Sequence, residues 1–319
     1  MKIAIVGIGS IGGLIAGQIA NLNKHDLLLC TKNDIQKLEL ITNGLTIVSP
    51  ANSNITIDYD IFSVCSGIDD LDDKWINSCD LVLICTKSHS THEASYFAKK
   101  IISKNGYCIS IQNGIGNEEV ISSVIGFNSV LGGVITHGAN KVDSSVINWA
   151  GMGEIIIGKM PLTKINLDLI EHFISIFNEA NLNASSVHDI RVNLWSKLSI
   201  NAAINPIAAI CGVNNGALIE PYLFECSISA MQEVLQVARA IGVDVPSNHE
   251  MINSLTQIIK NTKENRCSML QDIMNGRRTE IDSICGEVIK NAENLGIQTP
   301  VNYTLMSIVK GISSSNFIP

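Results

Sequence analysis

The stretch that decides the fold is KIAIVGIGSIGGLIAGQIA, residues 2–20. Residues 2–6 form a short apolar run that predicts a buried strand. A helix-like stretch of small residues follows the strand and extends to about Leu22. Between them stand three glycines in G-x-G-x-x-G register, which permit a tight turn, backbone approach to a pyrophosphate and close helix packing. Free N–H groups at the helix start attract phosphates. The predicted dinucleotide-binding loop comprises Gly7, Ile8, Gly9, Ser10, Ile11 and Gly12. The alternative is a glycine-rich helix entry that binds no ligand.

The chain beyond this loop alternates strands and helices to about residue 188. Strand-like segments are DLLLC (26–30), DLVLICTKS (80–88), YCISIQNG (107–114) and NASSV (183–187), and helices are expected over about 90–104 and 166–180. Short strand-like runs over 129–158 are expected to extend or complete the same sheet without intervening helices. The pattern predicts an α/β, Rossmann-like dinucleotide-binding domain over residues 1–188. Ligands of such sheets lie at the carboxyl ends of the strands, where Lys87 and Asn113 fall.

Residues 189–319 have a different, helical pattern. Helices are expected over 190–211, 221–241, 248–261, 267–275, 279–295 and 301–312. Strand-like alternation is absent from this part of the sequence. The second domain is therefore predicted to be all-α.

The end of the second predicted strand bears on the choice of dinucleotide. An NAD site usually carries Asp or Glu there for the ribose hydroxyls, but this chain reads CTKND. Thr31 and Lys32 could instead meet a 2′-phosphate, which favours NADP over NAD. The alternative is that Lys32 is an ordinary surface lysine.

Two helical segments concentrate polar residues in apolar surroundings. In LWSKLSINAAINP (194–206), steps of four place Lys197, Asn201 and Asn205 on one stripe. In CSMLQDIMNGRRTEID (267–282), Ser268 precedes an Asn-Gly break and Glu280 opens the next helix. A carboxylate close to a lysine would keep both ionised and orient the ammonium as a proton donor. Taken alone, the lysine could snorkel, the glutamate could serve the helix dipole, and the asparagines could be bonded core amides.

Composition excludes several classes of function. The net charge is −8 and the longest Lys/Arg clusters are pairs, so nucleic acid is not an expected partner. The nine cysteines are scattered without metal spacing, and His89 and His92 have no third ligand, so no metal is expected. The glycines of residues 3–20 make a poor signal-peptide core. We therefore expect a cytoplasmic protein that does not bind membranes.

Taken together, these motifs resemble those of one enzyme family. G-x-G-x-x-G, CTKS (85–88), QNGIGNEE (112–119), WSKLSINAAINPIAAICGVNNGAL (195–218) and CSMLQDIMNGRRTEID follow in this order. The chain resembles the ketopantoate reductases, which use NADPH to reduce 2-dehydropantoate to pantoate on the pantothenate and coenzyme A pathway. The resemblance spans essentially the whole chain.

The resemblance implies roles for particular residues. Lys197 matches the catalytic lysine, and Glu280 matches a glutamate that contacts the substrate and organises the site. Substrate-binding positions are matched by Asn113, Asn201, Asn205, Asn215 and Ser268, and Lys87 and Asn113 match cofactor-binding positions. The sequence departs from the family at Ser90, where glutamine is frequent, and at Lys32, which has no arginine nearby. Both departures concern the adenosine phosphate.

The resemblance leaves other functions open. The chain could reduce another branched 2-keto acid, or it could be a non-catalytic NADP-binding sensor. The pair Lys197 and Glu280 argues against a sensor, which would need neither residue. A homodimer is compatible with the family, although no feature of this sequence sets the oligomeric state.

Overall fold

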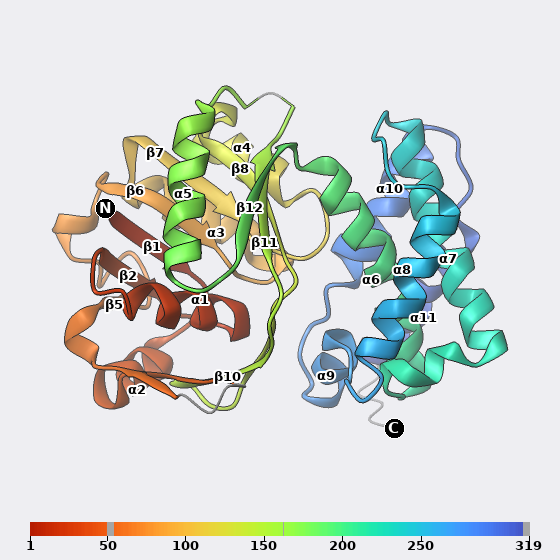
Figure 1. Ribbon diagram of the computed structural model, residues 1–319, viewed down its shortest axis with the longest axis horizontal. Coiled ribbons are helices and arrows are strands. Elements are labelled where there is room, and N and C mark those ends of the chain that lie inside the picture. The colour runs from red at the N-terminus through yellow and green to blue at the C-terminus, as the bar shows by residue number, and fades with distance from the viewer. Residues whose placement is uncertain (50–53, 162, 315–319) are drawn as a thin grey trace. The chain divides into compact units, whose positions relative to one another are not determined.

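The computed structural model describes residues 1–49, 54–161 and 163–314, and it divides into two compact units (Figure 1). The first unit comprises Met1–Gln112 and Asn117–Ile190, and the second comprises Asn113–Gly116 and the residues from Arg191 onward. The sequence pattern assigns residues 113–116 to the first domain and divides the chain near residue 188. These four residues cluster with the helical unit because the backbone N–H of Ile115 donates to Ser283 O at 3.3 Å.

The first unit is built on an eight-stranded sheet of order β12-β11-β8-β7-β6-β1-β2-β5. The strands are β1 (Lys2–Val6), β2 (Asp26–Cys30), β5 (Ser63–Cys65), β6 (Cys79–Ile84), β7 (Ile102–Ser110), β8 (Val130–Ile135), β11 (Ile155–Lys159) and β12 (Ala184–Asp189). Neighbouring strands from β5 to β8 pair in parallel, whereas β11 is antiparallel to β8. The order reverses at β1, which is where doubly wound sheets bind ligands.

Helices cover both faces of this sheet. They are α1 (Ser10–Ala20), α2 (Asp34–Asn43), α3 (Thr91–Ile101), α4 (Asn117–Ile125) and α5 (Leu167–Glu179). Successive strand residues point to opposite faces, so Ile3 and Ile5 join one core cluster with α1 and α5, while Ala4 and Val6 join another with α3 and α4. Covered on both sides, the central strands are continuously apolar, as a parallel sheet requires. The Rossmann-like prediction is confirmed.

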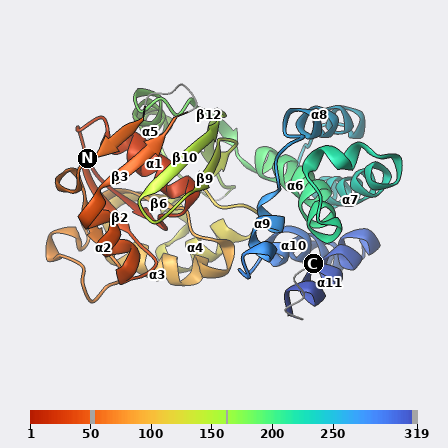
Figure 2. The same cartoon turned by 90° about the horizontal axis from the view of Figure 1, so that it is seen from below.

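A second sheet corrects one expectation. The run at 144–150 does not extend the main sheet, although β8 and β11 do. It forms β10 (Val146–Gly151) in a four-stranded sheet with β3 (Leu45–Val48), β4 (Ile55–Ile57) and β9 (Gly138–Lys141). Figure 2 shows β3, β10 and β9 of this sheet. Side chains of Ile47 and Ile147 lie where a Cβ on Gly17 or Gly13 of α1 would be. The absence of side chains at Gly13 and Gly17 therefore lets the small sheet pack closely against α1.

The second unit is helical, as predicted. Its helices are α6 (Arg191–Cys211), α7 (Pro221–Ala240), α8 (Asn248–Asn261), α9 (Ser268–Met274), α10 (Glu287–Asn294) and α11 (Pro300–Ser314). Helix α6 packs against α7, α9 and α11 and is the centre of the unit. The helix expected over 279–295 is a π-helical turn, Asp282–Gly286, followed by α10. Such turns often accompany functional sites, and this one begins two residues after Glu280.

Candidate active site

The glycine-rich loop has the geometry of a phosphate-binding turn. Gly7 has φ +98°, a conformation that side chains rarely adopt, and its N–H donates to Cys30 O at 3.0 Å. A Cβ on Gly12 would collide with the Gly7 carbonyl, so α1 approaches the turn closely. A Cβ on Gly9 would meet no atom within 4 Å. The loop is therefore tightly closed at its base and open where a pyrophosphate would approach.

The other loop residues hold the turn in place. Ile8 is buried and belongs to the core, and Ile11 is half-buried against the same core. Ser10 begins α1, and its hydroxyl accepts a hydrogen bond from the backbone N–H of Lys141 at 3.0 Å. The structure thus brings all the residues predicted for the loop together at the end of β1.

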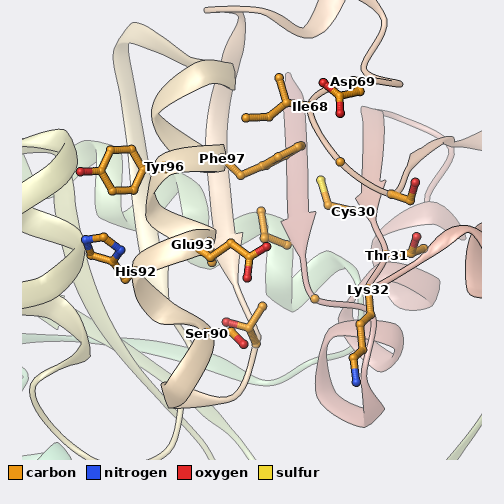
Figure 3. A pocket seen from close by; sticks show the side chains of 16 residues that line it. Cys30, Thr31, Lys32, Ile68, Asp69, Ser90, His92, Glu93, Tyr96 and Phe97 are labelled. Atoms are coloured by element: carbon orange, nitrogen blue, oxygen red, sulfur yellow. The ribbon is translucent and has the colours of Figure 1, made fainter.

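A pocket of about 710 Å³ opens beside the loop, at the carboxyl ends of β1, β2, β5 and β6 (Figure 3). Its lining includes Gly7, Cys30, Thr31, Lys32, Asp69, Thr86, Ser90, His92, Glu93 and Phe97. This is the side of the sheet where doubly wound domains bind the adenosine half of a dinucleotide. The position of the pocket and the open loop beside it fit the adenosine end of a dinucleotide.

The rim of this pocket carries charges of both signs. Lys32 is exposed at the tip of β2, and the carboxylates of Asp69 and Glu93 belong to the same lining. Thr31 is buried, and its hydroxyl lies 3.1 Å from Asn33 O and 3.2 Å from Cys65 O. Because that hydroxyl bonds the backbone, a 2′-phosphate would depend on Lys32 rather than on the pair that the sequence suggests.

Sequence reasoning missed Gln36, which supports the loop from α2. Its Nε2 donates to the carbonyl of Ile8 at 2.6 Å, and its backbone N–H donates to Asn33 Oδ1 at 3.0 Å. The Ile8 carbonyl oxygen accepts this hydrogen bond from the buried Gln36 amide. The bond holds the oxygen against the protein and away from the space where a phosphate would bind. The spacing of Asn33 and Gln36 signals the start of α2, but it does not indicate that the Gln36 side chain reaches Ile8.

Lys87 lies in the loop between β6 and α3, and a buried glutamine organises that loop. Nε2 of Gln112 donates to Thr86 O and to the hydroxyl of Thr91, each at 2.9 Å. These bonds fix both sides of Lys87, which is half-buried. Gln112 directly precedes Asn113, so one amide connects the two motifs that the sequence analysis singled out.

The helical unit brings together three of the predicted residues. Asn113 Nδ2 donates to Glu280 Oε2 at 3.1 Å, and Glu280 is buried. Lys197 on α6 is half-buried, and desolvation lowers its pKa to about 8, while the negative charge of Glu280 acts in the opposite direction. An ammonium with a pKa near neutral pH is suited to proton transfer. This cluster is the candidate site for proton transfer in the second unit.

The predicted substrate residues occupy α6 and the segments beside it. Asn201 is half-buried and Asn205 is buried, one and two helical turns after Lys197. Ser268 is exposed at the start of α9, where Cys267 Sγ lies 3.5 Å from Asn205 O. Asn215 is buried, and its Nδ2 donates to Thr262 Oγ1 at 3.0 Å. All four residues belong to the unit that holds Lys197 and Glu280.

The described residues contain no group of three or more His, Cys, Asp and Glu side chains that could hold a metal ion. His92 lines the pocket of the first unit, and its ring packs on Tyr96 with centroids 4.9 Å apart. Across residues 1–49, 54–161 and 163–314, no helix is long and apolar enough to span a membrane.

Comparison with known proteins decides the family. Residues 3–161 match the model described as ketopantoate reductase PanE/ApbA, and residues 189–313 match its C-terminal model. A 2-dehydropantoate 2-reductase of Pyrococcus horikoshii is 34% identical, with 98% of each chain covered. The chain belongs to the ketopantoate reductase family. It is thus an oxidoreductase of a dinucleotide-dependent family, and the resemblance noted in the sequence is confirmed.

Solved structures agree with this assignment. A ketopantoate reductase from Ralstonia eutropha JMP134 matches with a TM-score of 0.86 and 26% identity over 99% of each chain. D-mandelate dehydrogenase, solved with NADH and anilino(oxo)acetate, matches with a TM-score of 0.89 and 21% identity over 100% of each chain. The second likeness shows that the ketopantoate reductase fold is shared with that enzyme.

Proposed function

We propose that this protein reduces 2-dehydropantoate to pantoate with NADPH, a step of pantothenate biosynthesis. The observation that carries the proposal is the cluster of Lys197, Glu280 and Asn113 within one unit of a ketopantoate reductase family chain. The names of the relatives support the substrate. The nine cysteines are all free, which supports a reducing compartment such as the cytoplasm.

In the proposed mechanism Lys197 is the proton donor. Bound NADPH supplies the hydride that converts the C2 ketone to an alcohol. Negative charge develops on the ketone oxygen, and the protonated Lys197 gives its proton to that oxygen. Glu280 contacts the substrate and keeps Lys197 from losing its proton too readily, because its charge opposes the effect of desolvation. Asn113 donates to Glu280 and thereby fixes the carboxylate.

The remaining residues bind the two reactants. We assign substrate binding to Asn113, Asn201, Asn205, Asn215 and Ser268, whose uncharged groups hydrogen-bond a hydroxylated acid without opposing its charge. We assign cofactor binding to the loop of Gly7–Gly12 and to Lys32, Lys87 and Asn113. The loop is closed at Gly12 and open at Gly9, and this geometry supports its assignment to cofactor binding.

The assay that tests this function is NADPH oxidation by the purified protein, followed as loss of absorbance. Ketopantoate is offered first, then 3-methyl-2-oxobutanoate, phenylglyoxylate and pyruvate, with NADH in parallel. Turnover that is fast with ketopantoate and slow with the others is the expected result. Preference for another acid would change the substrate but keep the chemistry. Binding of NADPH without turnover of any acid would point to a sensor.

Lys32 should set the preference for NADPH over NADH. Replacement by Glu places a negative charge beside the 2′-phosphate, so KM for NADPH should rise by about ten- to a hundredfold. KM for NADH, which lacks the phosphate, should change little. Asp69→Asn is the companion variant with the opposite expected effect. It removes a negative charge from the same pocket and should shift the preference toward NADPH. Equal effects of Lys32→Glu on both dinucleotides would remove Lys32 from the phosphate site.

A further inference from the structure

Asn215 is anchored on the segment that follows α8. Its backbone N–H donates to Asn265 O at 2.9 Å, and the N–H of Gly216 donates to Lys263 O at 3.0 Å. A Cβ on Gly216 would lie 2.9 Å from that Lys263 oxygen, so a larger residue would push the segment away. Two hydrogen bonds therefore hold the backbone at Asn215, and the orientation of its side-chain amide is a separate question.

Thr262 orients that amide. The hydroxyl of Thr262 donates its single hydrogen to Ile258 O at 2.7 Å. Toward Asn215 it can therefore offer only a lone pair, which accepts from Nδ2 at 3.0 Å. A flipped amide would place Oδ1 against the Thr262 oxygen, with no hydrogen between them. The orientation of the Asn215 amide is thus set by the hydrogen bond that Thr262, 47 positions later in the chain, donates to Ile258 O.

The other end of the amide is buried and unused. Asn215 is 7% exposed, and its Oδ1 has no hydrogen-bond partner among the described residues. Buried polar atoms are almost always bonded, so an acceptor left in this state calls for a donor from elsewhere. Thr262 makes this atom an acceptor; with the amide flipped, the same position would present an N–H donor.

We propose that Thr262 is a positioning residue for substrate specificity, which makes Asn215 present an acceptor to a hydroxyl group of the 2-keto acid. The inference rests on the proposed function and names the residue that would make this site require a hydroxyl group on its 2-keto acid. A site built to bond a hydroxyl discriminates strongly against an analogue that lacks it, because its own polar group is then left unpaired. Thr262 itself does not touch the substrate.

The test compares ketopantoate with 3,3-dimethyl-2-oxobutanoate, which has the same carbon skeleton without the 4-hydroxyl. For each variant, kcat/KM is measured with both acids at saturating NADPH. Thr262→Val removes the hydroxyl and keeps the shape, so the ratio of the two kcat/KM values should fall about tenfold, through KM for ketopantoate. Thr262→Ser should restore the ratio. KM for NADPH should be unchanged throughout.

The matched control is Thr256→Val, on the helix α8 that Thr262 caps. The hydroxyl of Thr256 also donates within α8, to Ile252 O at 2.8 Å, and no side chain accepts from it or donates to it among the described residues. This control should leave the ratio unchanged. If Thr262→Val does not fold, Thr262→Ala removes the same hydroxyl with a smaller side chain and carries the test.

The outcomes separate the two claims. Wild-type protein that reduces neither acid would overturn the proposed function. Active wild-type protein whose ratio survives both Thr262→Val and Thr262→Ala would overturn the role of Thr262 and leave the proposed function intact. An equal fall of the kcat/KM ratio in Thr256→Val would also overturn the role of Thr262, since the effect would then come from a general disturbance of α8.

Discussion

Replacement of Lys197 by Met should lower kcat for ketopantoate reduction by about a thousandfold, the size expected for loss of a general acid. Met keeps most of the volume and the unbranched shape of the side chain, so α6 should stay packed. Without the ammonium, the alkoxide that forms at C2 has no proton donor from this position. The Kd for NADPH should be unchanged, because the predicted cofactor loop belongs to the other unit.

Single-turnover kinetics with bound NADPH would check this, with Kd measured separately by fluorescence. Lys260→Met is the matched control, since this exposed lysine lies on α8 in the same unit. It should leave kcat unchanged. Wild-type kcat in Lys197→Met would remove Lys197 from the chemistry.

The pH profile gives the same assignment a second readout. Burial lowers the pKa of Lys197 to about 8, and the proposed mechanism uses the protonated form for reduction. The wild-type kcat/KM should therefore be level below pH 8 and fall tenfold per pH unit above it. Pantoate oxidation requires the neutral amine, so it should rise through the same range. In Lys197→Met the limb near pH 8 should be missing from both directions.

Replacement of Gly9 by Ala should weaken NADPH binding severely and leave the fold intact. The added methyl meets no atom within 4 Å, and the backbone at Gly9 is extended (φ −89°, ψ −157°), so the protein itself tolerates it. In the complex the methyl would occupy space that the pyrophosphate needs. One overpacked methyl costs about 1–3 kcal/mol, which raises Kd up to about a hundredfold.

Two further variants isolate the effect. Gly12→Ala places its methyl against the Gly7 carbonyl, so this variant should lower the melting temperature as well as binding. Gly311→Ala, in α11, adds a methyl with no atom within 4 Å, so it should leave NADPH binding unchanged. Its melting temperature should not fall, because alanine favours a helix more than glycine does. A Gly9→Ala protein that binds NADPH normally would exclude the loop from the pyrophosphate site. Calorimetry for binding and thermal unfolding monitored by circular dichroism supply both measurements.

Sequence was sufficient wherever the information is local. Residues 2–12 specify a strand, a turn and a helix start through apolar runs and glycines, and these depend only on neighbours in the chain. The stripe of Lys197, Asn201 and Asn205 follows from helical periodicity alone. The family could be named because its motifs occur in order. The run at 144–150 was misplaced because a strand pattern does not specify which strand it pairs with, and the glycines of α1 that receive β10 lie far away in the sequence.

The sequence by itself determined the fold class, the family and the residue types available for catalysis. Only the tertiary structure decided their states: that burial lowers the pKa of Lys197 to about 8, that the Thr31 hydroxyl is bonded to the backbone, and that Gln36, Gln112 and Thr262 orient groups distant in the chain. The physical reason is that desolvation and hydrogen-bond polarity depend on which atoms surround a group in space. Residue spacing along a strand or helix does not contain that information.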